Sequence, residues 1–373
     1  MRAKKILIAV VAVGALMLSA CSGGGGGGSG DGGGDGGLIG VSMPTKSIQR
    51  WIQDGDELKS ILEEQGYKVD LQYADDDVPT QISQVENMLT KGAEALIIAA
   101  VDGTTFSEVL QNAADGDVPV IAYDRLIRDT ENVDYYASFD NYKVGQQQAW
   151  AVLNGLGLAE LDGTPIEGAP TGPFNLEVFF GSPDDNNATF LWDGGMNELQ
   201  PYIDAGTLVI KSGQDTPEQA ATLGWDPETA QSRMENILTS TYSDGSTVDA
   251  VLSPNDGLAR GIISAFTDAG YTVGSDWPII PGQDAELDSV KAIVAGEQYA
   301  SIFKDTRELA QVAADMVVAS LNGEEPQVNN TADYDNGVKV LPSYLLEPVI
   351  VVKDSIDKIL IDSGYWTESE IYG

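Results

Sequence analysis

The stretch that decides the fold is ALIIAAVDGTTFSEVLQNAADGDVPVIAYDR, residues 95–125. Its first six residues predict a buried strand, the amphipathic run at 104–114 predicts a helix, and 118–122 predicts a second strand. A strand–helix–strand unit with apolar, β-branched strands is typical of a parallel sheet that helices cover on both faces. The unit ends on the polar pair Asp124-Arg125, directly after the second strand.

The same alternation continues on both sides of this unit. Towards the N-terminus we expect strands at 38–43 and 67–73, each followed by a helix, and towards the C-terminus a strand at 135–139. A Gly/Pro-rich patch at 163–173 precedes a second series of strands and helices, which runs to about residue 360. The sequence therefore predicts an α/β fold with two open, parallel-sheet halves.

The first 37 residues predict targeting rather than folding. A positive start is followed by an apolar run at 6–18, which is shorter than the roughly 20 residues that span a bilayer and fits a signal peptide. The run ends in Leu18-Ser19-Ala20-Cys21, the pattern of a bacterial lipobox. We expect a signal peptide at 1–20, lipidation of Cys21 and a Gly-rich tether at 21–37; the alternative is an ordinary signal peptide with a chance cysteine.

Composition excludes several classes of function. The chain has 20 Lys and Arg against 58 Asp and Glu, a formal net charge of −38, one cysteine and no histidine. Without histidine there is no Ser-His-Asp triad and no His-ligated zinc site, and one cysteine excludes an intrachain disulfide. So much negative charge would repel nucleic-acid phosphates, so we expect no nucleic-acid partner.

Polar side chains follow the predicted strands in both halves, where ligands of open α/β sheets bind. They are Arg50, Asp124, Arg125, Asn141, Asp184, Asp185, Asn187, Asn255, Asp256, Gln283, Asp284 and Lys304. Carboxylates and amide oxygens accept hydrogen bonds from sugar hydroxyls, whereas Arg, Lys and amide nitrogens donate to them. The apolar face of a sugar ring also needs an aromatic platform, for which the candidates are Trp51, Phe190, Trp192 and Trp225.

Each of these residues has a simpler interpretation as well. Asn141 and Asn255 precede or open predicted helices and would cap them. Trp192 and Trp225, taken singly, are more typical of packing residues. Oxygen ligands at 184–186 would suit a cation, but the glycine and the terminal Glu of a calcium loop are missing, so we expect no metal site and no cofactor.

With these motifs the chain resembles a known family. Its most specific pieces are Met43-Pro44-Thr45 with Arg50-Trp51, Ala122-Tyr123-Asp124-Arg125, Ser138-Phe139-Asp140-Asn141, Pro254-Asn255-Asp256 and Gly282-Gln283-Asp284. Across nearly all of residues 38–373 it resembles the periplasmic sugar-binding proteins of the ribose/galactose-binding type, and most of all the xylose and multiple-monosaccharide receptors of ABC importers. The Gly-rich lipid tether departs from the soluble start of those proteins.

The resemblance implies a type I periplasmic binding protein, with two Rossmann-like lobes joined by a three-crossing hinge. One lobe would hold 38–140 plus about 305–325, and the other 141–304 plus about 326–373.

The resemblance also implies the site. Sugar hydroxyls would contact Arg50, Asp124, Arg125 and Asn141 from the N-lobe, and Asn187, Asn255, Asp256, Gln283, Asp284 and Lys304 from the C-lobe and hinge. Trp51 would stack on the pyranose, with Phe190 as a second platform. Asp256 and Asp284 would accept two hydroxyls each, and Arg125 would donate to the ring or anomeric oxygen.

The function implied is capture of a monosaccharide by lobe closure and its delivery to an ABC permease with its ATPase. Xylose, glucose, galactose, arabinose and fructose all stay open, and so does the reason for the acidity. We expect a monomeric protein that is lipid-anchored to the outer face of the cell membrane, and no catalysis.

One alternative is a sensor subunit that presents its closed form to a membrane signalling receptor. A remoter one is a glycoside hydrolase, but Asp124, Asp256 and Asp284 beside Arg, Asn and Gln should have lowered pKa values, whereas that reaction needs a raised one.

Overall fold

The computed structural model describes residues 36–373, which lie in one compact unit. The predicted signal peptide, the lipidation of Cys21 and nearly all of the tether lie outside the described residues. None of the described helices is long and apolar enough to span a bilayer.

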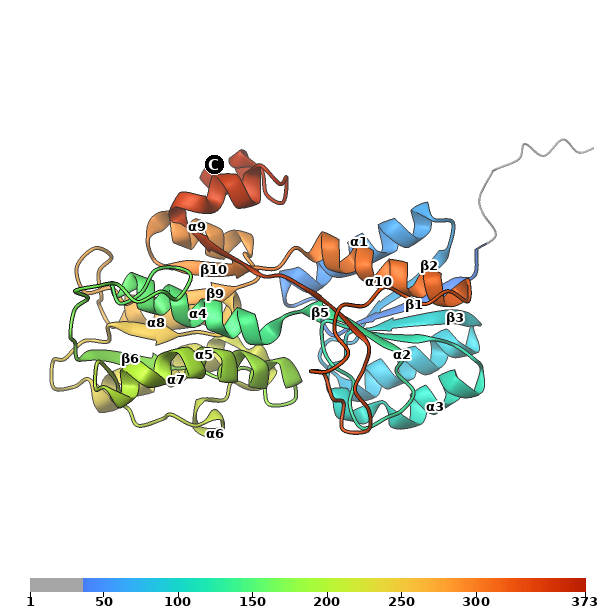
Figure 1. Cartoon of the computed structure of the whole chain (residues 1–373), viewed down its shortest axis with the longest axis horizontal. Coiled ribbons are helices and arrows are strands. Elements are labelled where there is room, and N and C mark those ends of the chain that lie inside the picture. Colours follow the sequence, from blue (N-terminus) through green and yellow to red (C-terminus); the bar gives the residue numbers. More distant parts are fainter. Residues whose placement is uncertain (1–35) are drawn as a thin grey trace, which may run out of the picture. The chain divides into compact units, whose positions relative to one another are not determined.

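The N-lobe is built on a six-stranded parallel sheet in the order β11-β5-β4-β3-β1-β2 (Figure 1). The strands are β1 (Leu38–Met43), β2 (Lys68–Tyr73), β3 (Ala93–Ile98), β4 (Val120–Tyr123), β5 (Tyr135–Phe139) and β11 (Ser343–Leu346). Its helices are α1 (Gln49–Glu64), α2 (Val78–Thr90), α3 (Ser107–Asp115) and α10 (Thr306–Leu321), with a 3₁₀ turn at Gly103–Thr105. α1 and α10 lie side by side on one face of the sheet and α2 and α3 on the other, so two apolar cores form.

The C-lobe repeats this arrangement with shorter strands. One group of strands is β7 (Leu208–Ile210), β6 (Phe174–Val178) and β8 (Ala250–Leu252), and the other is β12 (Val349–Val352), β10 (Ala300–Phe303) and β9 (Pro281–Gln283). A parallel bridge from Ala250 to Ile279 joins the groups, and only β12 among these strands runs antiparallel. The longer helices are α4 (Asn141–Gly155), α5 (Asn186–Asp204), α7 (Pro227–Thr241), α8 (Asp256–Asp268) and α9 (Leu287–Ala295). Short helices complete the lobe: α6 (Pro217–Ala220), the 3₁₀ helices η2 (Leu223–Trp225) and η3 (Lys353–Ser355), the π-helical η4 (Asp357–Ile361) and α11 (Glu368–Tyr372).

The segment after residue 326 corrects the predicted lobe boundaries. We expected all of it in the C-lobe, but β11 pairs in parallel with β5 at the edge of the N-lobe sheet. Tyr334 and Leu341 are buried in the N-lobe core. The chain therefore crosses between lobes after β5, between β10 and α10, and between β11 and β12. The prediction was wrong here because most of this segment is irregular and carries no strand or helix period.

Helices α7 and α8 approach so closely that a glycine is required between them. At Gly261 in α8, a Cβ would stand 2.1 Å from the Pro227 carbonyl oxygen. At Gly257, one turn earlier in the same helix, a Cβ would meet nothing nearer than 3.7 Å. Of these two glycines, only Gly261 is required for the close approach of α7 and α8. Helix α8 begins at the strand end where Asn255 and Asp256 were predicted to bind ligand.

Asp256 is a fully buried carboxyl beneath β9. Its oxygens accept hydrogen bonds from Gln298 Nε2 (2.8 Å), Ser301 Oγ (2.9 Å) and the Glu286 backbone N–H (2.9 Å). Burial, reinforced by the nearby Glu286 carboxylate, raises the pKa of Asp256 to about 8. The expectation that its pKa would be lowered was wrong, because burial and, after it, the neighbouring Glu286 outweigh the hydrogen bond from the Gln298 amide.

The first prediction concerns the α7–α8 contact. Gly261→Ala should lower the free energy of unfolding by about 1–3 kcal/mol, because the added methyl overpacks a backbone contact. Gly257→Ala, the matched control, should leave it unchanged or raise it by about 0.4–1 kcal/mol. Urea denaturation of both variants measures the difference; equal stabilities would contradict the close approach.

The second prediction concerns pH. Because the folded state raises the pKa of Asp256 from 3.8 to about 8, it binds this proton more tightly than the unfolded chain does. The stabilisation is complete below the unfolded pKa and is lost as pH rises through the folded one. The free energy of unfolding of wild type, relative to Asp256→Asn, should therefore fall between roughly pH 4 and 8. Thermal unfolding of both proteins across this pH range measures the difference. If the stability of the two proteins depended on pH in the same way, the buried, protonated carboxyl would be contradicted.

Candidate functional site

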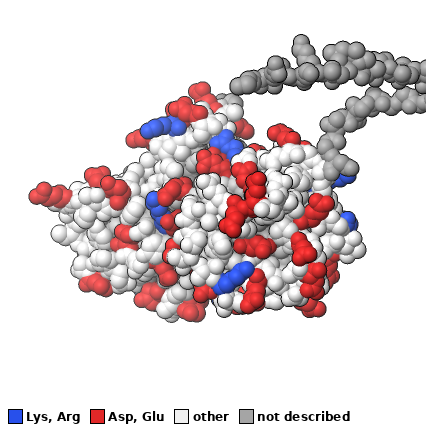
Figure 2. Space-filling model, turned by 45° about the vertical axis from the view of Figure 1, so that its right-hand side comes forward, with Lys and Arg blue, Asp and Glu red and all other residues white. Residues whose placement is uncertain are grey.

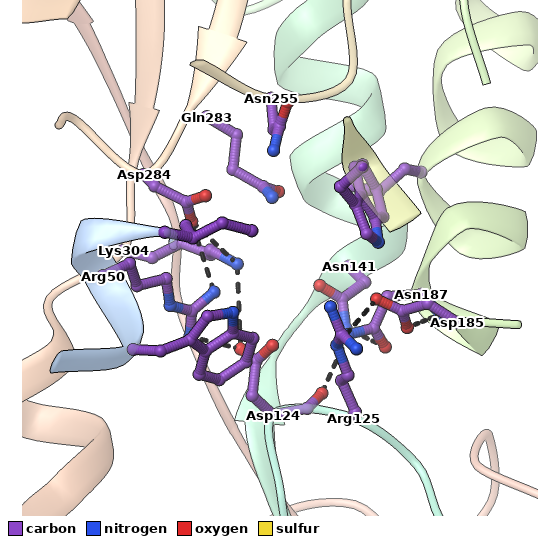
Figure 3. A pocket seen from close by; sticks show the side chains of 14 residues that line it. Arg50, Asp124, Arg125, Asn141, Asp185, Asn187, Asn255, Gln283, Asp284 and Lys304 are labelled. Carbon is purple, nitrogen blue, oxygen red and sulfur yellow. Dashed lines mark hydrogen bonds and ion pairs between the residues drawn. The ribbon is translucent and has the colours of Figure 1, made fainter. Parts of the chain in front are cut away.

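A cavity between the lobes collects ten of the twelve predicted site residues. The predicted residues that line it are Arg50, Trp51, Asp124, Arg125, Asn141, Asn187, Asn255, Gln283, Asp284 and Lys304, joined by Ile48, Asp185, Leu191 and Trp225. The cavity is narrow in this arrangement of the lobes, with a volume of about 30 Å³. Figure 3 shows these side chains converging from both lobes.

Arg50 in the first turn of α1 connects three carboxylates. Its Nε lies 3.0 Å from Asp54 Oδ2, one helical turn further on, and its Nη2 lies 2.5 Å from Asp124 Oδ2. The third contact crosses to the other lobe, where Nη1 lies 3.3 Å from Asp284 Oδ1. Burial alone would lower the pKa of Arg50, but the carboxylates outweigh it and raise the pKa well above its usual value. Arg50 therefore stays charged and joins the lobes directly.

Asp124 lies on a strained turn directly after β4. Its φ is +57°, and the Arg125 N–H donates across it to the Tyr123 carbonyl at 2.6 Å, which is the hydrogen bond of a γ-turn. The Asp124 carbonyl in turn accepts from Tyr136 Oη (2.5 Å) and Ser138 Oγ (3.0 Å), both on the neighbouring β5. The sheet thus holds the turn in a conformation that an aspartate adopts at an energetic cost.

The Asp124 carboxylate is kept ionised by the cations around it. Burial by itself would raise its pKa, but Arg50 and then Lys304 outweigh burial and lower the pKa to about 2. Such a carboxylate accepts hydrogen bonds at any physiological pH. It has no proton to donate, which agrees with the expectation of a lowered pKa at this position.

Asp284 and Lys304 bring the C-lobe and hinge into the same cluster. Asp284 follows β9, with φ at +95°, and Lys304 follows the neighbouring strand β10. Lys304 Nζ lies 3.1 Å from Asp284 Oδ1 and 3.7 Å from Asp124 Oδ2. Adjacent parallel strands end at the same sheet edge, which is why residues 20 apart in sequence meet here.

A second set of contacts crosses the lobes on the other side of the cavity. Arg125 Nε lies 3.3 Å from Asp185 Oδ2, and Asp185 Oδ1 accepts from the Asn187 backbone N–H at 2.9 Å. Asn187 Nδ2 donates to the Asp124 carbonyl (2.8 Å), and its Oδ1 accepts from Asn141 Nδ2 (3.0 Å). Burial raises the pKa of Asp185 despite the nearby Arg125. Asp185 therefore serves in an ion pair and as the N-cap of α5.

Three buried polar atoms in the cavity wall have no hydrogen-bond partner within residues 36–373. One, Arg125 Nε, still has its ion pair with Asp185, whereas the acceptor Gln283 Oε1 and the donor Trp225 Nε1 have neither kind of partner. Leaving a buried polar group unpaired costs about 1–3 kcal/mol, so a ligand that both donates and accepts would relieve both. Asn255 combines its two predicted roles, because its Oδ1 caps α8 at Leu258 N (2.8 Å) while the residue lines the cavity. In Figure 3 the amide groups of Asn255 and Gln283 point into the same space.

The charges that line the cavity balance. Three cations, Arg50, Arg125 and Lys304, face three carboxylates, Asp124, Asp185 and Asp284. The outer surface differs, since acidic side chains are spread over the face seen in Figure 2 and basic ones are few. A neutral ligand fits such a balanced cavity, because a charged ligand would leave one charge unpaired away from water.

The aromatic predictions were partly wrong. Phe190 does not line the cavity; its ring packs on Tyr334, 4.8 Å away, against the N-lobe core. Trp192 is a core residue, as its simpler interpretation held, but Trp225 both packs in the core and lines the cavity. Gly181 makes room for the Trp225 side chain, because a Cβ at this position would stand 2.2 Å from the indole.

Of the two predicted residues outside the cavity, Asp256 has the clearer physical explanation. Asn255 and Asp256 follow one strand as neighbours, but successive side chains point in different directions. Asn255 lines the cavity, whereas Asp256 points beneath β9, where Gly282 leaves room for its carboxyl. Asp256 is therefore not a direct acceptor for ligand. Trp51 does line the cavity, with the Arg50 and Arg125 guanidinium groups 4.8 and 5.2 Å from its ring centre.

Comparison with known proteins identifies the family. Residues 39–325 match the periplasmic binding protein domain. The chain is 56% identical to the multiple sugar-binding periplasmic receptor ChvE of Rhizobium radiobacter, over 90% of this chain and 93% of that protein. It is 37% identical to the D-xylose-binding periplasmic protein of Escherichia coli, over 89% and 92% of the two chains.

A solved structure gives the same result. The ABC transporter solute-binding protein from Clostridium phytofermentans, with bound β-D-glucose, is 48% identical and superposes with a TM-score of 0.84, over 90% of this chain and 99% of that one. These relatives are receptors and binding proteins, not enzymes. The chain therefore belongs to the periplasmic binding protein family and has its type I fold, with two parallel-sheet lobes joined by a three-crossing hinge.

Proposed function

We propose that this protein captures a neutral monosaccharide between its lobes, outside the cytoplasm, and delivers it to an ABC import permease. The observation that carries the proposal is the interlobe cavity, where charges balance and a buried donor and acceptor lack partners. The names of its relatives, which bind several sugars, xylose and glucose, support the same ligand class.

Each lobe would contribute one carboxylate and at least one donor to the sugar. Asp124 and Asp284 would accept from hydroxyls, and Arg125 and Lys304 would donate to hydroxyl or ring oxygens, in charge-assisted hydrogen bonds. Trp51 from the N-lobe and Trp225 from the C-lobe would cover the apolar faces of the ring. Arg50, already bound to three carboxylates, would act mainly by holding Asp124 and Asp284 in place.

Lobe closure follows from this division of groups. The closed arrangement already has direct interlobe contacts, from Arg50 to Asp284 and from Arg125 to Asp185. A sugar bound to both lobes would add contacts that an open form lacks, and the population would shift by that difference in free energy. The closed form would then dock on the permease and its ATPase.

A lipid on Cys21 would keep the receptor beside that permease. Sixteen residues, most of them glycine, separate that anchor from the first strand. The receptor, acting as a monomer, would then reorient freely while it stays close to the membrane.

The third prediction tests the ligand class. Calorimetric titration of the purified protein with D-glucose, D-xylose, D-galactose, L-arabinose and D-fructose should give saturable 1:1 binding for at least one of them. A neutral amino acid and a nucleoside serve as controls, and neither should bind. Binding of a control ligand without binding of any monosaccharide would overturn the proposal.

The fourth prediction tests the site. Asp284→Ala should weaken sugar binding about 30-fold or more, since a hydrogen bond to a charged group contributes about 2 kcal/mol. Phe190→Leu, at a predicted site residue that lies outside the cavity, should leave the dissociation constant within about twofold of wild type. Circular dichroism checks that both variants fold. Full affinity in a folded Asp284→Ala protein would refute the assignment of Asp284.

A further inference from the structure

The loop that presents Asp284 has an unusual backbone. Asp284 and Ala285 are consecutive residues with positive φ, +95° and +49°. For residues other than glycine the left-handed region costs roughly 1–2 kcal/mol each, so the surroundings must hold such a pair in place. The position of the Asp284 carboxylate, 3.3 Å from Arg50 Nη1 and 3.1 Å from Lys304 Nζ, depends on this backbone.

Three successive backbone N–H groups of the loop are held from the C-lobe interior. They donate to the next strand and to two buried side chains: Asp284 N to Ile302 O (2.9 Å), Ala285 N to Ser301 Oγ (2.9 Å) and Glu286 N to Asp256 Oδ2 (2.9 Å). Ser301 and Asp256 are themselves hydrogen-bonded to each other. This buried pair therefore fixes one side of the turn.

The other side of the turn is held by the C-terminal segment. Trp366 Nε1 donates to the Ala285 carbonyl at 2.8 Å, across 81 residues of sequence, and the indole is buried. Trp366 packs in one apolar cluster with Ala285 and Phe303. Phe303 is the last residue of β10 and precedes Lys304, and its ring contacts Tyr365 at 4.7 Å. The C-terminal segment therefore supports both strand ends that carry the C-lobe charges of the cavity.

We propose that Trp366 is a positioning residue for ligand binding: its indole N–H fixes the left-handed turn at Asp284–Ala285 and thereby aims the Asp284 carboxylate into the cavity. This inference rests on the proposed function, in which Asp284 accepts hydrogen bonds from the sugar. Trp366 itself does not line the cavity. Its effect on affinity must therefore pass through the turn.

A matched pair of variants separates this role from simple packing. Trp366→Phe keeps an aromatic ring in the cluster and removes the N–H. Trp277→Phe removes the same kind of bond elsewhere in the C-lobe, since Trp277 Nε1 donates to the Glu297 carbonyl at 2.7 Å, away from the ligand cavity. Calorimetry should give about five- to tenfold weaker sugar binding for Trp366→Phe and a change within about twofold for Trp277→Phe. Equal affinities for the two variants would overturn the proposal.

A double-mutant cycle tests whether the effect passes through Asp284. In the Asp284→Ala background there is no carboxylate to aim, so adding Trp366→Phe should weaken binding by less than about twofold. The same five- to tenfold loss in both backgrounds would mean that Trp366 supports the lobe in general. That result would contradict a role through Asp284.

Amide hydrogen exchange of the sugar-free protein separates failure of this inference from failure of the proposed function. The Ala285 and Glu286 amides should exchange faster in Trp366→Phe than in Trp277→Phe, whichever ligand the protein binds. Unchanged exchange would refute the inference, whereas absence of sugar binding by wild type would refute only the proposed function. If Trp366→Phe does not fold, Ser301→Ala, which removes the partner of the Ala285 N–H, tests the same turn by the same two measurements.

Discussion

The site depends on the ion pairs of one buried group, the guanidinium of Arg50. It contacts Asp54 and Asp124 in its own lobe and Asp284 in the other. A charge away from water is tolerated only when it is paired and hydrogen-bonded, so all three carboxylates are needed where they are. Because two of them also face the cavity, the same network that closes the lobes sets the positions of the acceptors offered to a ligand.

The two acceptors share a second feature, which is strain. Asp124 in the N-lobe and Asp284 in the C-lobe both have positive φ, and each follows a parallel strand. Neighbouring elements hold both turns through the backbone: Tyr136 and Ser138 on β5 donate to the Asp124 carbonyl, and Ser301 Oγ accepts from the N–H of Ala285, the residue after Asp284. Strained turns that several hydrogen bonds hold in place are rigid. Acceptors on such turns lose little conformational freedom when a ligand binds.

The charge of the protein has a different meaning inside and outside. The chain has a formal net charge of −38, and acidic side chains are spread over the face shown in Figure 2. Inside, the cavity has three cations against three carboxylates, and the buried Asp256 has its pKa raised to about 8. The net charge of the sequence therefore bears on how the molecule interacts with its surroundings and says little about the ligand.

The sequence by itself determined the alternation of strands and helices and the polar residues at strand ends. These are local properties, and parallel strands bring their carboxyl ends together wherever they pair. Only the tertiary structure decided that Asn255 faces the cavity while Asp256 lies beneath β9, that Phe190 packs on Tyr334, and that β11 returns to the N-lobe. Direction, burial and pairing depend on neighbours distant in sequence, and no local pattern carries that information. Trp366 shows this most clearly, because its contact with the Asp284 turn joins residues 81 positions apart.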